Sequence, residues 1–265
     1  MQQRQTPTLN ETPPVPALLQ RWPHRRRLLA ALALALACCS ALALRQVAKA
    51  RTWQAFGELT ARVDLQEKVV ALTFDDGPSE RGLAAVLPVL EQRGIKATFF
   101  LIGRTLERDP SLGSRLVRAE HEIGNHTYQH KPMLFRSLAS MADEVERTDA
   151  LIRRIGFRGP IHFRPPGGRK LLGLPWYLAA THRRTIMWDV DPESYVEAAS
   201  DLVAYTREHV RPGSIIILHP MTRPGDETRA ALPALVDGLI ADGYRFVTVT
   251  ELLALAERGE SAQPR

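Results

Sequence analysis

Seven apolar runs of strand length follow one another along the chain from Val69 onward, and segments with helical spacing separate them. The runs read VVALTF, ATFFLIG, HEIGN, IHFR, TIMWDV, SIIILH and YRFVTV. Short runs of this kind are typical of buried strands, and strands that alternate with helices build a parallel sheet with helical crossovers. The pattern therefore predicts an α/β fold, a slightly short or open (β/α)7 TIM-like barrel, in which chemistry gathers on loops at the carboxyl ends of the strands.

The excess of basic over acidic residues lies entirely in the first 50 residues of the chain. The whole chain has 35 Lys and Arg against 29 Asp and Glu, a net charge of +6. Residues 1–50 alone hold seven basic groups and one acidic group, so the rest of the chain is neutral on balance. A neutral body lacks the basic surface that nucleic-acid binding requires, and no nucleic-acid partner is expected.

The leader contains RRRLLAALALALACCSALALR, in which three arginines precede an apolar run from Leu28 to Leu44. This pattern predicts a signal anchor or a signal peptide with the body outside the cytoplasm, either periplasmic or extracellular. Small residues at 41 and 43 and at 48 and 50 provide two cleavage sites, whereas the long polar extension before the arginines favours an uncleaved anchor. A buried core helix is the alternative. Core helices of soluble proteins, however, rarely have three consecutive arginines before an apolar block that has no polar face.

The chain is expected to divide into four parts. Residues 1–50 form a cytoplasmic tail and the membrane or signal segment, and residues 51–67 form a connector that is part helix. Residues 68–250 form the catalytic domain, and residues 251–265 form a C-terminal helix and tail. Cys38 and Cys39, the only cysteines, lie in the apolar run, so the body has no disulfide.

Polar clusters follow five of the strand-like runs. Asp75 and Asp76 follow the first run. The clusters at the ends of the third to sixth runs are NHTYQH, FRPPGGR, WDVDPES and ILHP. Adjacent carboxylates repel each other and call for a nearby cation. His126 and His130 are four residues apart, so on one helical turn both imidazoles would face one ion; the alternative is a surface pair or a helix cap. With one carboxylate they would form three ligands and an open position, as in catalytic zinc sites.

The motifs TFDDGPS, HTYQH, RPPGG and ILH, in this order, resemble the polysaccharide deacetylases of carbohydrate esterase family four, the nodulation-type chitooligosaccharide deacetylase homology domain. The resemblance covers nearly the whole body. It implies a distorted barrel enzyme that removes N-acetyl, sometimes O-acetyl, groups from sugar polymers with one divalent metal, for which zinc is expected.

The resemblance also implies roles for matching residues. Asp76, His126 and His130 match the metal ligands, and Asp75 matches the general base. A ligating Asp76 cannot serve as a free base, so its neighbour must do so.

Four further positions complete the implied site. Arg164 matches the arginine that orients the base, and His219 matches the general acid that protonates the leaving amine. Gly167 stands where the family usually has Tyr, and its backbone N–H still serves as an oxyanion donor. Ile217 replaces the leucine of the pocket that holds the acetyl methyl group.

The segment after Trp188 departs from the family. Where the family often has Asp followed by Trp to tune the general acid, the chain has Ser194 and Tyr195. Asp189 or Asp191 is the substitute that the sequence offers. The remaining histidines outside the leader match no motif and are interpreted as structural: His121, His162, His182 and His209.

The predicted function is hydrolytic removal of N-acetyl groups from an extracytoplasmic polysaccharide that contains N-acetylglucosamine. Two alternatives remain open. One is a glycan-binding protein on a decayed enzyme fold, which the altered segment at Ser194 suggests. The other is an amidase of a small non-sugar substrate, which would use the same metal chemistry.

Overall fold

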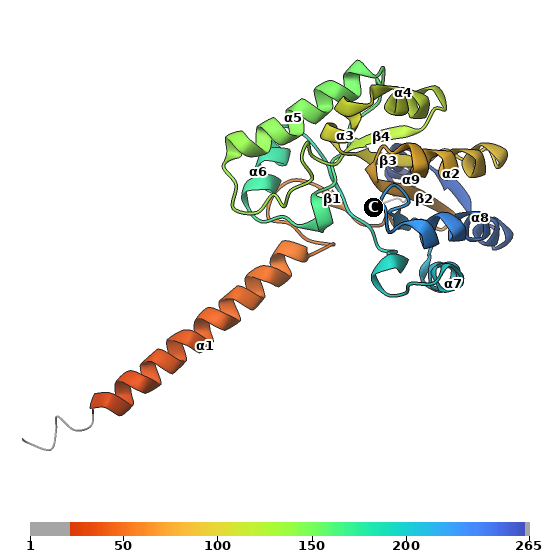
Figure 1. Cartoon of the computed structure of the whole chain (residues 1–265). Helices are drawn as coiled ribbons and strands as arrows, with labels where there is room; N and C mark the ends of the chain where they lie inside the picture. Colours follow the sequence, from red (N-terminus) through yellow and green to blue (C-terminus); the bar gives the residue numbers. More distant parts are fainter. Residues whose placement is uncertain (1–21, 263–265) are drawn as a thin grey trace, which may run out of the picture. The chain divides into compact units, whose positions relative to one another are not determined.

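The structure, a computed structural model, describes residues 22–262 and divides the chain into two compact units, one ending at Gln46 and the other beginning at Val47. Helix α1 (Trp22–Lys49) carries the apolar run (Figure 1). Within α1, Arg27–Lys49 is long and apolar enough to cross a membrane, with a mean hydropathy of 2.2. The predicted apolar helix is thus present, and its role as an anchor or a signal stays a prediction.

A parallel sheet forms the centre of the second unit (Figure 1). Strand β2 pairs with β6 along one edge. Along its other edge, β3 pairs with the C-terminal half of β2 and β7 pairs with the N-terminal half. Strand β4 extends the sheet beyond β3. The strands of this sheet are β2 (Val69–Gly77), β3 (Thr98–Leu101), β4 (Glu122–Asn125), β6 (Ile215–Leu218) and β7 (Arg245–Val247).

Short pairings continue the wall between β4 and β6. Strand β1 (Leu59–Thr60) pairs with β5 (Thr185–Ile186). Isolated bridges join Phe163 to Asn125 and to Thr185, and Val190 to Ile216. The predicted α/β fold with parallel strands is confirmed.

Two local predictions were wrong. The run IHFR forms only the bridges of Phe163 and no strand, because the two prolines that follow it, Pro165 and Pro166, have no N–H with which to continue a ladder. The connector 51–67 contains strand β1 and no helix. Its pairing with β5 is a contact across more than 120 residues of chain, which local propensity does not reveal.

Helices surround this sheet. They are α2 (Glu80–Gln92), α3 (Gly103–Arg108), α4 (Pro110–Arg118), α5 (Leu138–Arg154), α6 (Gly173–Ala180), α7 (Ala199–His209), α8 (Asp226–Ala241) and α9 (Val249–Ala262). Two 3-10 helices, η2 (Pro166–Gly168) and η3 (Pro192–Ser194), lie in loops. Capping residues help to define the starts of helices: Ser79 accepts a hydrogen bond from the backbone N–H of Gly82 at 3.2 Å, as is typical of an N-cap.

Strand β2 separates two apolar layers. Val70, Leu72 and Phe74 pack under the outer helices, whereas Val69 and Ala71 face a second cluster that contains residues of β6 and α9. Successive side chains of a strand point to opposite faces. Thr73 and Asp75 continue the second series, so the alternation of β2 aims Asp75 toward the same interior.

Candidate metal centre and active site

The two adjacent aspartates reach one site because the backbone turns between them. Asp75 is buried, and Asp76 adopts a left-handed conformation with φ 67°. The carboxylate oxygens of Asp75 and Asp76 lie 3.6 Å and 3.5 Å from Nε2 of His126. A regular strand would send the two side chains to opposite faces, so the turn at Asp76 is what brings both acids to the same imidazole.

His126 and His130 lie in a loop after β4, not on the helical turn that their spacing predicted. Thr127 and His130 have positive φ values of 65° and 57°. The backbone N–H of Thr127 bonds to the side chain of Asn125 at 2.8 Å, and that of His130 bonds to Thr127 Oγ1 at 3.1 Å. These local hydrogen bonds replace a helical turn, and the two rings still come within 4.8 Å of each other, centre to centre.

Three candidate ligand atoms converge. One atom each from Asp76, His126 and His130 lies within 4.8 Å of the others, and Nε2 of His130 is 2.9 Å from Oδ1 of Asp76. That oxygen is buried and has no hydrogen-bond partner within residues 22–262. Burial alone would raise the pKa of Asp76, but the adjacent imidazoles of His126 and His130 lower it.

The tautomer of His126 follows from its other nitrogen. Nδ1 lies 2.7 Å from the backbone carbonyl of Arg164, and since a carbonyl only accepts, Nδ1 carries the hydrogen. Nε2 then presents a lone pair toward the carboxylates. A second hydrogen bond of this kind is the usual support of a metal-ligating histidine, so the donor set fits a divalent cation.

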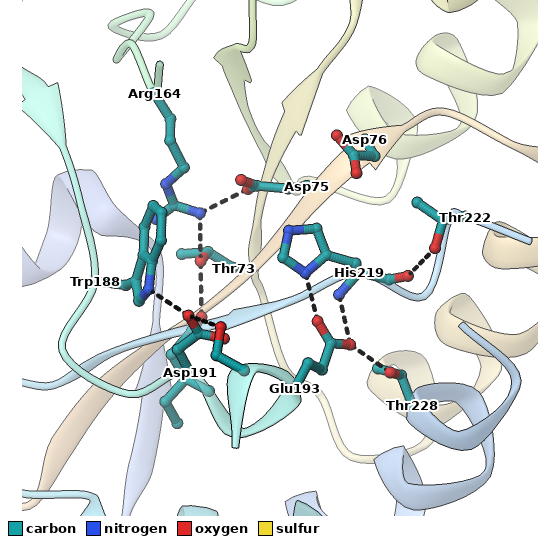
Figure 2. A network of polar contacts seen from close by, with 12 residues as sticks. Thr73, Asp75, Asp76, Arg164, Trp188, Asp191, Glu193, His219, Thr222 and Thr228 are labelled. Atoms are coloured by element: carbon teal, nitrogen blue, oxygen red, sulfur yellow. Dashed lines mark hydrogen bonds and ion pairs between the residues drawn. The ribbon is translucent and has the colours of Figure 1, made fainter. Parts of the chain in front are cut away.

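Asp75 is held by a buried arginine (Figure 2). Nη1 of Arg164 donates to Asp75 at 2.6 Å and to Thr73 Oγ1 at 2.8 Å. The guanidinium also donates to the carbonyls of Ile186 and Met187 and lies over the ring of Phe100. Burial lowers the pKa of Arg164 and the charge of Asp75 opposes this, while an arginine keeps its proton in proteins. Asp75 thus faces a fixed positive charge on one side and His126 on the other.

Glu193 is the acid that contacts His219 (Figure 2). Its carboxylate bonds to Nδ1 of His219, accepts the backbone N–H of His219 at 3.0 Å, and accepts a hydrogen bond from Thr228. Burial lowers the pKa of His219, but the hydrogen bond that His219 donates to Glu193 and the charges of Glu193, Asp75 and Asp76 outweigh it and raise the pKa to about 9. His219 is therefore held in the protonated form that a general acid needs.

The residues predicted to tune His219 point elsewhere, which corrects that assignment. Asp189 binds the hydroxyl of Ser214 and the backbone N–H of Ile215. Asp191 accepts hydrogen bonds from Trp188 Nε1 at 3.0 Å, Ser194 Oγ at 2.8 Å and Arg51 Nη2 at 3.0 Å. The turn of η3 directs the residue before Ser194 toward His219. The sequence did contain a signal for this contact, because Glu193 is an acidic residue directly before Ser194, the position where an acid was expected.

The two predicted substrate positions lie at different depths. Gly167 is exposed on η2 with φ 58°, a conformation that favours glycine. A Cβ there would meet only the Arg169 side chain, at 3.9 Å. Ile217 is buried in β6 in register with Thr73 and belongs to the interior apolar cluster. Their roles toward an oxyanion and an acetyl group stay predictions.

The fold and this site together define an α/β-barrel hydrolase. Residues 62–182 match the family described as Polysaccharide deacetylase. A peptidoglycan-N-acetylglucosamine deacetylase of Bacillus cereus is 35% identical over 204 residues, which cover 74% of this chain and 93% of that protein. The chain belongs to the polysaccharide deacetylase family, as its motifs predicted.

Two further similarities show the range of the family. The peptidoglycan-N-acetylmuramic acid deacetylase PdaC of Bacillus subtilis is 30% identical over 202 residues, covering 75% of this chain and 42% of that protein. The crystal structure of a CE4 family pseudoenzyme from Bacillus anthracis has a TM-score of 0.68 at 27% identity, and covers 75% of this chain and 69% of that chain. The family thus includes proteins named for different sugars and a protein named as inactive.

Proposed function

We propose that this enzyme, a polysaccharide N-deacetylase by family, removes N-acetyl groups from an N-acetylglucosamine-containing glycan outside the cytoplasm and uses one divalent cation, zinc. The observation that carries the proposal is the convergence of Asp76, His126 and His130 between a buried base, Asp75, and a protonated acid, His219. Relatives named as peptidoglycan deacetylases support a peptidoglycan strand as the glycan.

Asp76, His126 and His130 would hold the divalent cation, which when bound would supply a Lewis acid for the acetamide carbonyl and lower the pKa of the attacking water. The carboxylate of Asp75 takes a proton from that water while the water oxygen bonds to the carbonyl carbon. Arg164 holds Asp75 in place through its 2.6 Å hydrogen bond.

His219 then acts on the leaving group. The C–N bond breaks, the sugar nitrogen takes the proton of the His219 imidazolium, and acetate and a free amine result. Glu193 keeps His219 protonated and oriented through Nδ1, which leaves Nε2 as the nitrogen that gives up its proton. The backbone N–H of Gly167 is the donor proposed for the oxyanion.

The test measures acetate release by the full-length chain in detergent, with N-acetylglucosamine oligomers and peptidoglycan fragments as substrates and zinc added. We expect release from at least one glycan, and Asp75→Asn as the matched control should lose it while still binding metal. A protein that holds stoichiometric zinc but releases acetate from no acetylated glycan would refute the deacetylase proposal.

A glycan-binding protein without activity is the second candidate, because a related structure is described as a pseudoenzyme. Binding of glycan that is unchanged by Asp75→Asn, with no turnover by the parent, would favour it. A small amide hydrolysed faster than any glycan would favour the amidase. Here the ligands contact the base, the base bonds to Arg164, and His219 bonds to Glu193; the presence of all these residues supports the deacetylase.

A further inference from the structure

Helix α6 has no polar outer face. Its sequence is GLPWYLAA, and Leu174, Tyr177 and Leu178 pack into an apolar cluster with residues of α5. On the other side, Trp176 is 48% exposed, and Leu172, one turn earlier, is 62% exposed. A helix that is apolar all round belongs in a core or a membrane, yet Trp176 and Leu172 remain exposed among residues 22–262.

The segment that follows α1 runs beside α6 and adds to its apolar surface. At one end, the side-chain ammonium of Lys170 bonds to the carbonyl of Ala50. At the other end, Gly57 packs so closely on α6 that a Cβ at position 57 would lie 2.9 Å from Cβ of Ala179. Between these contacts, Trp53 and Phe56 are 53% and 43% exposed.

The start of α5 borders the same surface. Cδ2 of Leu138 lies 3.8 Å from where a Cβ on Gly173 of α6 would be, and Leu138 is 44% exposed. We call the five exposed side chains of this surface the apolar collar: Trp53, Phe56, Leu138, Leu172 and Trp176. Exposed apolar side chains that gather in one place mark an interaction surface more often than scattered ones do.

The apolar collar begins where α1 ends. The backbone N–H of Lys170 donates to the carbonyl of Ala48 at 2.9 Å, and Ala48 is only 5% exposed. Helix α1 continues without a break to Lys49. Four residues separate Ala48 from Leu44, the end of the apolar run, which is about 6 Å of helix. The catalytic unit therefore begins within a few residues of the apolar run along the chain.

We propose that the apolar collar lies on the surface of the lipid bilayer, so that this face of the catalytic unit binds the membrane. The proposal goes beyond the deacetylase activity and rests on the proposed membrane anchor. Tryptophan is enriched at the membrane interface, and the collar carries two. The exposed basic residues Lys49 and Arg169 flank the contact between residues 48–50 and Lys170, and they complement anionic headgroups.

The test uses tryptophan fluorescence of the full-length chain in nanodiscs of phosphatidylethanolamine and phosphatidylglycerol with brominated acyl chains. The difference between the parent and Trp176→Phe isolates the emission of Trp176. We expect this emission to be quenched by the brominated lipids and protected from acrylamide in the buffer. Co-elution of the chain with the nanodiscs tests the anchor separately, so failure of the anchor and failure of the collar are distinguishable.

A matched control places a tryptophan at an exposed position outside the collar. Ile240 on α8 is 44% exposed, close to the value for Trp176. In the Trp176→Phe background, Ile240→Trp should be quenched by acrylamide and not by brominated lipid. Emission of Trp176 that behaves like this control would overturn the proposal. Protection of Trp176 by N-acetylglucosamine oligomers in lipid without bromine would also overturn it and indicate a glycan subsite instead.

Discussion

Each of the three candidate metal ligands supplies one atom, so the loss of either histidine leaves two. Two ligands seldom hold a zinc ion tightly. We expect His126→Ala and His130→Ala to lose stoichiometric zinc, measured by elemental analysis after gel filtration of the full-length chain. Stoichiometric metal in either variant would show that the ion binds elsewhere.

Asp75 provides the complementary test because it lies beside the ligands without being one. Asp75→Asn keeps the shape of the side chain, so zinc should remain bound. The rate of acetate release should fall by roughly two to four orders of magnitude, the usual contribution of a positioned base. Steady-state kinetics with metal content measured on the same sample would check this, and near-parental rates would remove Asp75 from the mechanism.

Glu193 should determine the basic limb of the pH profile. His219 must be protonated to act, so activity falls as the pH rises through its pKa, which is raised to about 9. Glu193→Gln removes the negative charge and destabilises the imidazolium, so the limb should move to lower pH, toward the ordinary histidine value of about 6.5. The measurement is the rate of acetate release between pH 6 and 11.

Two neighbouring variants serve as controls for Glu193. Asp189→Asn should leave the limb unchanged, because Asp189 faces Ser214 and Ile215. Ser194→Asp should not raise it, since Ser194 points at Asp191. A downward shift in Asp189→Asn that matches the shift in Glu193→Gln would contradict the assignment of Glu193.

At the scale of elements, the N-terminus of α9 is fixed by β3 and β4. The buried carboxylate of Glu122 accepts hydrogen bonds from the hydroxyl of Thr98 at 2.6 Å and from the backbone N–H of Thr250 at 3.2 Å. Thr98 Oγ1 in turn accepts the backbone N–H of Val249 at 2.9 Å. A carboxylate at a helix N-terminus is favoured by the free N–H groups and the helix dipole, so this contact holds α9 under the barrel.

Replacing Glu122 with Gln should destabilise the catalytic unit. The amide cannot accept all the hydrogen bonds of the carboxylate, and a buried donor left unpaired costs about 1–3 kcal/mol. We expect a lower midpoint of thermal unfolding, followed by near-ultraviolet circular dichroism in detergent. Glu91→Gln on the exposed side of α2 is the control and should have little effect. Equal midpoints for the two variants would show that Glu122 does not support α9.

For the whole molecule, the division after Gln46 predicts that the catalytic unit does not need the apolar helix for chemistry. A chain that begins at Val47 keeps Ala48 and its contact with Lys170. It should appear in the soluble fraction, whereas the full chain stays with membranes. Its kcat/KM for soluble N-acetylglucosamine oligomers should match that of the full chain. Loss of activity on such oligomers would show that the membrane segment takes part in forming the site.

The sequence by itself determined the fold class, the family and most of the candidate site residues. The alternation of β2 and the order of the motifs are local patterns, and strand periodicity and residue spacing express them directly. Asp75, Asp76 and His219 could therefore be assigned to strand ends, and the family resemblance supplied their expected roles.

Only the tertiary structure decided how the loops meet. The turn that aims Glu193 and not Ser194 at His219 and the pairing of β1 with β5 depend on contacts between distant segments. Arg51 reaches Asp191 in the same way, across 140 residues. Loop backbones have weak local preferences, so their conformation is set by the partners that the fold brings to them, and a linear pattern does not contain those partners.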